Sequence, residues 1–308
     1  MNLLALLIGL IIERLATRLF HWRRMRWLER LIDTGFRVAM RVANWPAILL
    51  VLLLAIILIL PVFIVMFALG DALHGFPYFF LAIVVLFFSL GPKDIGEDVD
   101  EYCAAIEAGD EELARQRAKT LVEGPVSADP EERSREVEEA VFVQANNRLF
   151  AVIFWFVALG PLGPLGAWAY RVTDLIRRRA VFNTARDAVG TDADTVSDDV
   201  RDAAVRLHGW LAWVPARLTA VGYAIAGHFD AAFSAWRAPT PPSATGSAAS
   251  EQVLARVGVG ALALQTQEGE SSDSRAIRGA SAANRLVFRL LLIWAVIIAG
   301  LTLYGWSQ

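Results

Sequence analysis

The residues whose types suit ligand chemistry gather mainly in two apolar stretches of the chain that are broken by proline. Several are arginines, and a guanidinium group can hold a carboxylate or a phosphate through two parallel hydrogen bonds. Fixed positive charge in a partly dehydrated pocket favours such groups, so we predict an anionic ligand at the cytoplasmic face of a membrane. The candidate ligand-binding residues are Glu13, Arg14, Asn147, Arg148, Arg171, Asp174, Trp213, Pro215, Arg217 and His228.

These residue types also have structural interpretations. Each arginine can extend along apolar surface to the lipid headgroups. Trp213 and Pro215 are better suited to shaping a helix break than to touching a ligand. Glu13 and Arg14 follow ten apolar residues, so they either mark the end of a membrane helix or form a buried functional pair.

No motif of a familiar soluble enzyme is present: the chain has no Walker A loop, dinucleotide fingerprint, metal-spaced Cys/His set or nucleophile elbow. The four histidines, His21, His74, His208 and His228, are scattered, which is typical of surface or packing residues. We therefore predict no catalytic residue and no metal site, and the sequence leaves any cofactor unknown.

Composition indicates the class of protein in which these residues act. Of 308 residues, 56% are hydrophobic and 20% are charged, which excludes a disordered chain and argues for a membrane protein. The mean hydropathy is +0.46. Cys103 is the single cysteine, so no intrachain disulfide forms.

The predicted fold class is all-α: a polytopic integral membrane protein with broken or re-entrant membrane segments and helical cytoplasmic loops. Ala47 to Leu69 is the clearest span, because about 20 apolar residues cross the hydrocarbon layer. We predict six segments: a membrane helix with a basic cytoplasmic loop (1–46), a transmembrane hairpin (47–92), an acidic helical cytoplasmic loop (93–148), broken membrane segments (149–236), a flexible linker (237–285) and a C-terminal transmembrane helix (286–308).

Arginine placement predicts the orientation. Seven arginines lie between Arg18 and Arg41, interleaved with tryptophan, a pattern that suits an anionic membrane surface better than nucleic acid. The positive-inside rule makes loops 18–46 and 93–148 cytoplasmic. A single crossing at 149–170 would place Arg177 to Arg179 outside, so we favour a re-entrant hairpin that turns at Gly160-Pro-Leu-Gly-Pro-Leu-Gly166. Leu211 to Gly227, interrupted by Pro215, is predicted to be interfacial or half-inserted.

The acidic loop 93–148 reads as two or three amphipathic helices, with sixteen acidic and seven basic residues. Gly109 can end one helix and Asp110 can cap the next. Asp129-Pro130 starts a third helix, which we expect to continue without interruption to Phe150. The polar run 191–199 is predicted to be a linker that caps the following helix.

Two motifs carry a family resemblance. Trp213-Val-Pro-Ala-Arg-Leu-Thr219 and the Gly-Pro-Leu-Gly-Ala…Ala-Tyr-Arg…Asp174 element resemble the cobalamin-biosynthesis family CobD/CbiB. Glu13-Arg14-Leu15, Asn146-Asn-Arg148 and Gly227-His228 are closer to the AmpE family of inner-membrane proteins. The resemblance covers nearly the whole chain and all four hydrophobic segments.

The AmpE resemblance implies a sensor or signal-modulating protein of the bacterial inner membrane, linked to β-lactamase induction and cell-wall recycling. Its expected partners are the lipid bilayer and an anionic cell-wall-derived ligand or an AmpD-type amidase, with no nucleic acid. The CobD/CbiB resemblance implies an amide-forming synthase instead. That family's E-N-x-x-D-G and N-T-x-D-S motifs correspond here to Gln144–Phe150 and Tyr170–Ile176, which implies a shared scaffold with different site residues. A third alternative is a membrane scaffold that recruits partners through loop 93–148.

Overall fold

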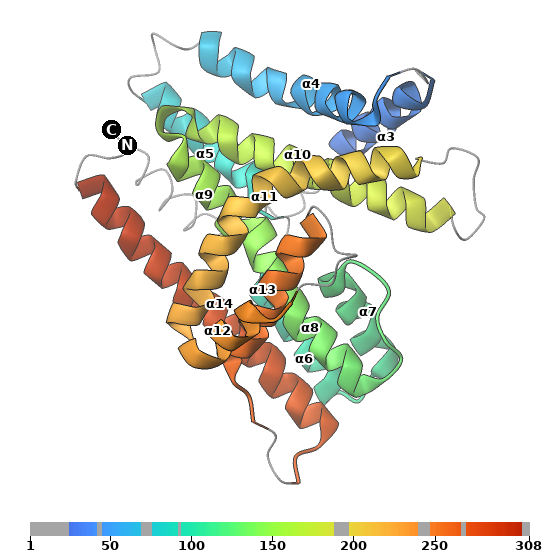
Figure 1. Cartoon of the computed structure of the whole chain (residues 1–308), viewed down its shortest axis with the longest axis vertical. Coiled ribbons are helices and arrows are strands. Elements are labelled where there is room, and N and C mark those ends of the chain that lie inside the picture. The colour runs from blue at the N-terminus through green and yellow to red at the C-terminus, as the bar shows by residue number, and fades with distance from the viewer. Residues whose placement is uncertain are drawn as a thin grey trace.

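A computed structural model describes residues 25–41, 45–68, 76–91, 94–187, 197–239, 247–265 and 269–303. Helices make up most of these residues, and no strand occurs among them (Figure 1). The all-α class predicted from the sequence is confirmed. Glu13 and Arg14, with the helix predicted around them, lie outside the described residues.

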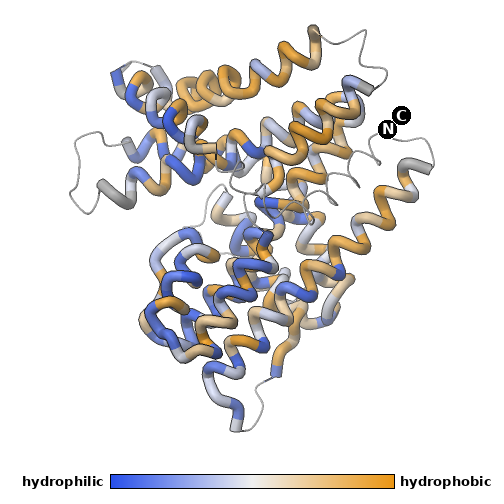
Figure 2. The backbone as a smooth tube through the Cα atoms, turned by 180° about the vertical axis from the view of Figure 1, so that it is seen from behind, coloured by the Kyte–Doolittle hydropathy of each residue, from blue (hydrophilic) through white to orange (hydrophobic). Residues whose placement is uncertain are grey.

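The helices form an apolar part and a more polar part, one above the other in Figures 1 and 2. The apolar part holds α3 (Arg26–Arg41), α4 (Ala47–Ala68), α5 (Phe76–Ser89), α9 (Ala151–Ala158), α10 (Gly163–Asp187) and the first half of α11 (Asp198–Ala226). The polar part holds α6 (Ile95–Glu107), α7 (Glu111–Val122), α8 (Pro130–Ala145), α12 (Phe229–Arg237), α13 (Ser247–Leu262) and the first half of α14 (Ser272–Leu303).

Three helical stretches of the described chain are long and apolar enough to cross a membrane: 47–68, 130–158 and 272–301. The first has most of its surface exposed, which in water would be costly for side chains such as Phe67 and Ile64. The second is largely enclosed by other helices. The chain is therefore a helical membrane protein, as its composition indicated.

The helix boundaries in the acidic region agree with the predicted caps. The Asp110 carboxylate accepts a hydrogen bond from the Leu113 amide at 3.0 Å and starts α7. The Asp129 carboxylate accepts from the Glu132 amide at 3.0 Å, and Pro130 is the first residue of α8. Gly109 has a φ of 67°, so it ends the preceding helical segment in the left-handed region as expected.

The predicted chain reversal after α9 is present. Gly160 has a φ of 54°, a short 3₁₀ turn covers Gly160–Leu162, and α10 runs back against α9 (Figure 1). Gly163 permits this close approach, because a Cβ there would lie 2.1 Å from the carbonyl oxygen of Phe156. Helix-breaking residues therefore make the tight turn that a re-entrant hairpin requires.

The second proline-broken stretch differs from the prediction. Helix α11 runs for 29 residues and includes Pro215 in its interior. A proline lacks the amide that would bond the carbonyl four residues earlier, here that of Leu211. The indole Nε1 of Trp155 on α9 donates to this carbonyl at 3.1 Å. The helix continues because a neighbouring side chain replaces the missing amide, and it bends in this region (Figure 1).

The structure also differs from the flexible linker expected over 237–285. Helix α13 covers Ser247–Leu262, and α14 already begins at Ser272. Leu254 and Val257 are fully buried in the core of the polar part. The small residues of this segment pack closely against α11 and α12, so low hydrophobicity here indicates tight packing and not disorder.

Replacing the indole donor tests the account of α11. We expect Trp155→Phe to lower the free energy of unfolding by about 1–3 kcal/mol, because the Leu211 carbonyl loses its partner. Thermal unfolding of the purified protein in detergent measures this change. Trp210→Phe on the exposed side of α11 is the matched control, and an equal loss in both variants would contradict the account.

Candidate functional site

A π-helical turn joins α8 to α9 and carries three polar residues, Asn146, Asn147 and Arg148. The Ala151 amide bonds the carbonyl of Asn146, five residues back, which widens the helix at this point. All three side chains are buried between the apolar and the polar parts. Such turns frequently interrupt helices at functional sites, which makes this one a candidate.

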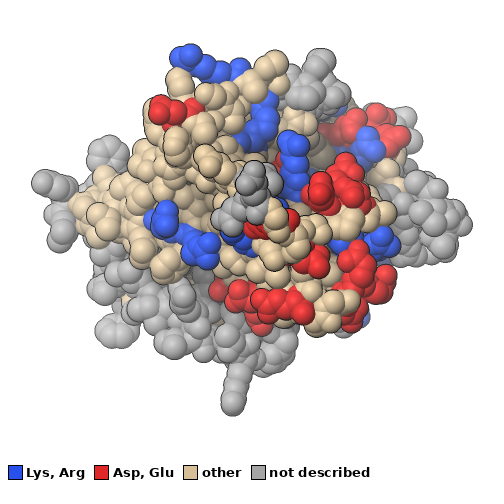
Figure 3. All heavy atoms as spheres, turned by 90° about the horizontal axis from the view of Figure 1, so that it is seen from below, with Lys and Arg blue, Asp and Glu red and all other residues tan. Residues whose placement is uncertain are grey.

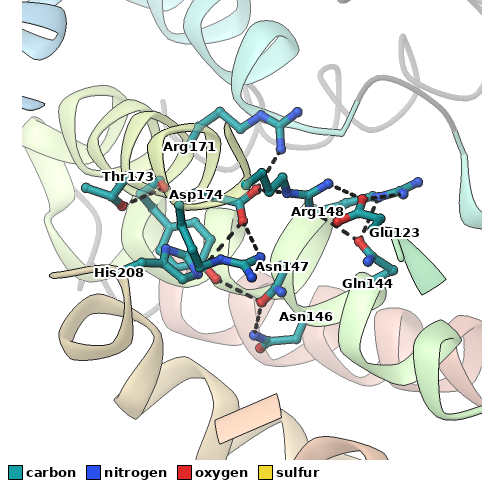
Figure 4. A network of polar contacts seen from close by, with 12 residues as sticks. Glu123, Gln144, Asn146, Asn147, Arg148, Arg171, Thr173, Asp174 and His208 are labelled. Atoms are coloured by element: carbon teal, nitrogen blue, oxygen red, sulfur yellow. Dashed lines mark hydrogen bonds and ion pairs between the residues drawn. The ribbon is translucent and has the colours of Figure 1, made fainter. Parts of the chain in front are cut away.

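The guanidinium group of Arg148 is bonded on every side (Figure 4). Its Nε donates to Gln144 Oε1, its Nη1 to Asp98 Oδ2 and its Nη2 to Glu123 Oε1, each at 3.0 Å. The carboxylates come from α6 and from the residue after α7. Arg148 therefore connects the π-helical turn to two helices of the polar part.

Asp174 is the centre of the second half of the network. It is completely buried, and it accepts from Arg171 Nη1 at 3.1 Å and from Arg177 Nη2 at 3.0 Å. Arg178 Nε lies 2.8 Å from its Oδ2. The four residues lie on successive turns of one face of α10, so the helix itself brings these three cations to one carboxylate.

Two carboxylates, those of Glu123 and Glu251, connect the contacts around Arg148 with the contacts around Asp174. Glu123 contacts Arg178 as well as Arg148. Glu251 on α13 lies 3.2 Å from Arg177 Nη1, and its Oε1 is 3.5 Å from Asn147 Nδ2. We call the resulting set the charge network, and it balances four positive and four negative side chains: Arg148, Arg171, Arg177, Arg178, Asp98, Glu123, Asp174 and Glu251.

Uncharged polar groups surround the charge network. Asn147 Oδ1 accepts from Asn146 Nδ2 at 3.1 Å and from the Tyr170 hydroxyl at 3.2 Å. Thr219 on α11 donates to Asn146 Oδ1 at 3.0 Å. His208 is fully buried beside Asp174, with its Nε2 3.9 Å from Oδ1 and neither ring nitrogen hydrogen-bonded within the described chain.

The network opens on one side into a cleft of about 880 Å³. Its walls come from the end of α7, from α8, α10 and α13, and they include Gln144, Asn147, Arg177, Arg178 and Glu251. The other charged residues along the cleft are Lys119, Glu123, Glu136 and Glu139. The charge network therefore has one face that a ligand can reach.

Four of the predicted site residues meet in this network: Asn147, Arg148, Arg171 and Asp174. Their guanidinium groups are already paired with carboxylates, so none of them extends to a lipid headgroup. The residues Arg177 and Arg178, which reach the cleft, were read from the sequence only as markers of orientation.

The other predicted residues lie apart from this centre. Arg217 stacks on Trp213, 4.1 Å from the ring centroid, and its Nη1 donates weakly to Ser250 Oγ at 3.4 Å. Arg171 and Arg217 share no partner among the described residues. His228 is exposed at the start of α12, where its amide donates to the Ala261 carbonyl at 2.8 Å. Pro215 is buried inside the continuous helix α11, so the helix break expected there does not occur.

The sequence analysis did not find Asp98, Glu123, Glu251 or His208. Asp98 and Glu123 lie in a region with many other acids, and Glu251 lies in a segment that was expected to be a linker. A usable signal was present on α10, where Asp174 precedes Arg177 and Arg178 by three and four residues, the spacing of helical ion pairs.

No group of three or more His, Cys, Asp or Glu side chains in the described ranges could hold a metal ion. Comparison with solved structures gave no match. The relatives of this chain are similar to it in sequence, and they fall into two groups, AmpE and CobD proteins.

The chain matches the family model described as "Regulatory signalling modulator protein AmpE" over residues 1–307. Protein AmpE of Shigella flexneri is 27% identical over 99% of both chains. Cobalamin biosynthesis protein CobD of Stutzerimonas stutzeri is 28% identical over 69% of this chain and 68% of its own. The CobD protein of Chromobacterium violaceum is 26% identical over 52% of this chain and 47% of its own.

Apolar helices of membrane length around a buried charge network define a polytopic helical membrane protein. Within that class, the match over nearly every residue shows that this chain belongs to the AmpE family. The resemblance to the AmpE family inferred from the motifs is confirmed. The CobD relatives confirm the predicted similarity to the CobD/CbiB family.

The charge network makes the stability of the protein depend on Glu123. Burial raises the pKa of its carboxyl, but the charges of Arg178 and Arg148 outweigh this effect and hold the pKa below its usual range. A carboxyl with a lowered pKa in the folded state stabilises the fold above its unfolded pKa, and this contribution is lost as the pH falls below about 4.5.

We expect Glu123→Gln to lower the free energy of unfolding by about 1.5–3 kcal/mol at pH 7, because the charge-assisted hydrogen bonds from Arg148 and Arg178 are weakened. The difference between wild type and variant should shrink between pH 5 and pH 3, measured as the midpoint of thermal unfolding. Glu131→Gln, which removes an exposed carboxylate of α8, is the control. A wild-type advantage that is constant over this range would contradict the assignment.

Proposed function

We propose that this protein is a signal modulator of the bacterial inner membrane, linked to β-lactamase induction and cell-wall recycling, and that it senses an anionic ligand. Membership of the AmpE family supports the regulatory part. The observation that carries the ligand site is the opening of the charge network into the cleft through Arg177 and Arg178. We place this cleft and loops 18–46 and 93–148 on the cytoplasmic side.

The network offers a physical means of sensing. An anion in the cleft competes with Asp174, Glu123 and Glu251 for the guanidinium groups of Arg177 and Arg178. Glu123 follows α7 and Glu251 lies on α13, so an exchange of partners breaks the ion pairs that connect both helices to α10. A ligand that binds one arrangement better shifts the population toward it.

The same mechanism changes a surface to which a partner protein can bind. Figure 3 shows acidic side chains gathered on the side of the molecule formed by α6, α7 and α8. An AmpD-type amidase or another cytoplasmic protein that binds this side would respond to movement of α7. The scaffold alternative is in this way part of the same proposal.

Filling the cleft tests the proposal without altering a charged residue. Ala248 on α13 lines the cleft, whereas Ala249 does not. We expect Ala248→Trp to change β-lactamase induction in the same direction as deletion of the gene, and Ala249→Trp to leave induction near the wild-type level. Induced β-lactamase activity and muropeptide pools are measured, with membrane levels of each variant checked by immunoblot. Unchanged induction and pools in the deletion strain would refute the regulatory proposal.

An amide-forming synthase of the CobD type is the second candidate, favoured by one observation. The structure brings the two segments that correspond to the CobD/CbiB motifs, Gln144–Phe150 and Tyr170–Ile176, together at the charge network. Expression in a strain that lacks the synthase distinguishes the two candidates. We expect no restored cobalamin-dependent growth, and growth would establish the enzyme instead.

A further inference from the structure

The cleft beside the charge network has a second set of charges that the anionic ligand does not use. Glu136, Glu139 and Val143 lie on one face of α8, and this face continues to Gln144 and Asn147 at the network. The cleft therefore has an acidic end at Glu136 and Glu139 and an end at Arg177 and Arg178. The other charged groups of its lining are Lys119 on α7 and the two carboxylates that pair with these arginines, Glu123 and Glu251. We propose that its ligand is a short peptide with a free ammonium group at one end and a carboxylate at the other, a deduction that rests on the proposed function.

The helix sets the distance between the two ends. Arg178 Nη2 lies 3.3 Å from Gln144 Oε1, and Arg177 shares Glu251 with Asn147, so both arginines are level with these residues of α8. Eight residues separate Glu136 from Gln144 and Glu139 from Asn147, which is about 12 Å along the axis. A free amino acid is too short to reach both ends.

A peptide of three residues matches this spacing. An extended chain covers about 3.3–3.6 Å per residue, so three residues cover about 10 Å, and the side chains of the cleft close the remaining gap. Glu139 is available to the ammonium group, since its recorded ion partner is the exposed Arg135 at 3.3 Å, a pair that contributes little. Glu136 has one oxygen engaged by the Ser127 amide at 2.9 Å and can accept further bonds.

Side-chain amides of the cleft suit a peptide backbone. Gln144 and Asn147 lie beside the arginines and Gln252 also lines the cleft, and their amide groups can pair with peptide N–H and C=O groups. Gln252 Oε1 and Arg177 Nε are buried atoms without a hydrogen bond in the described structure. An unsatisfied buried acceptor and donor are costly, and a ligand that supplies one N–H and one oxygen relieves both after small side-chain rotations. Apolar groups such as Val181 and Phe182 contact small side chains of the peptide.

Three peptides of equal length distinguish the contribution of the ammonium group to binding from that of the carboxylate. Trialanine has both, N-acetyl-trialanine lacks the ammonium group and trialanine amide lacks the carboxylate. Binding to the full-length protein in lipid nanodiscs is measured by calorimetry. We expect trialanine to bind about tenfold more tightly than either capped form, the change that follows from losing one charge-assisted hydrogen bond.

Protein variants locate the acidic end. In the double variant Glu136→Gln/Glu139→Gln, trialanine and N-acetyl-trialanine should bind equally, because the partner of the ammonium group is gone. The control Glu112→Gln/Glu131→Gln removes the same charge from exposed positions of α7 and α8 outside the cleft, and it should keep the tenfold preference. Ala248→Trp should abolish binding of all three peptides.

The outcomes separate this inference from the proposed function. If N-acetyl-trialanine binds wild-type protein as tightly as trialanine, the ligand is an anion without an ammonium group, and the inference falls while the sensing proposal stands. If no peptide binds, although Ala248→Trp changes β-lactamase induction in cells, the cleft signals but its ligand is not a peptide. If the peptides bind as expected and Ala248→Trp leaves induction unchanged, the inference stands and the regulatory proposal falls.

Discussion

Asp174 is a carboxylate without solvent contact, and three arginines of its own helix surround it. A buried charge must be compensated, and this group of four carries an excess of positive charge that one carboxylate cannot neutralise. Glu123 at the end of α7 and Glu251 on α13 supply the two remaining negative charges, while Asp98 on α6 pairs with Arg148 of the π-helical turn. The electrostatics of one face of α10 therefore explain why the end of α7 and α13 converge on the boundary with the apolar part, and Arg148 does the same for α6.

Where the backbone of a helix is irregular in this protein, a neighbouring element donates a hydrogen bond to the carbonyl group that is left free. The π-helical turn exposes the Arg148 carbonyl, which accepts from the Gly91 amide at 3.2 Å. The carbonyl that Pro215 leaves free accepts from the Trp155 indole. In each case a neighbouring element supplies the donor, a requirement for any broken helix away from water.

Local features of the fold could be predicted from the sequence because their causes are local. The caps at Asp110 and Asp129 and the turn at Gly160 depend on side chains within a few residues. Four site residues were found for a related reason, since Asn147, Arg148, Arg171 and Asp174 lie within or beside the two motif segments. The hydrophobic pattern also predicted the span at 47–68 and the apolar second half of the stretch 272–301, whereas most of the stretch 130–158 was expected to belong to a cytoplasmic loop.

The remaining site residues depend on packing between distant segments. An acidic region with sixteen acids does not reveal that Asp98 and Glu123 are the two that face Arg148. The run Arg177 to Arg179 was used only to predict membrane orientation, but all three arginines form ion pairs within the protein, Arg177 and Arg178 in the charge network and Arg179 with Asp33. Helix α13 was missed because its small residues resemble a linker until the faces of α11 and α12 are known.

The position of Glu251 has a consequence for how the protein is made. Asp98, Glu123 and Gln144 all precede Arg148 in the chain, so this arginine emerges from the ribosome with its partners already synthesised. The second carboxylate of Arg177, by contrast, follows only with α13, after the whole of α10, α11 and α12. Docking of α13 is therefore the step that completes charge balance, and the same step builds one wall of the cleft. A nascent chain therefore lacks the complete cleft until the charges of the network are balanced.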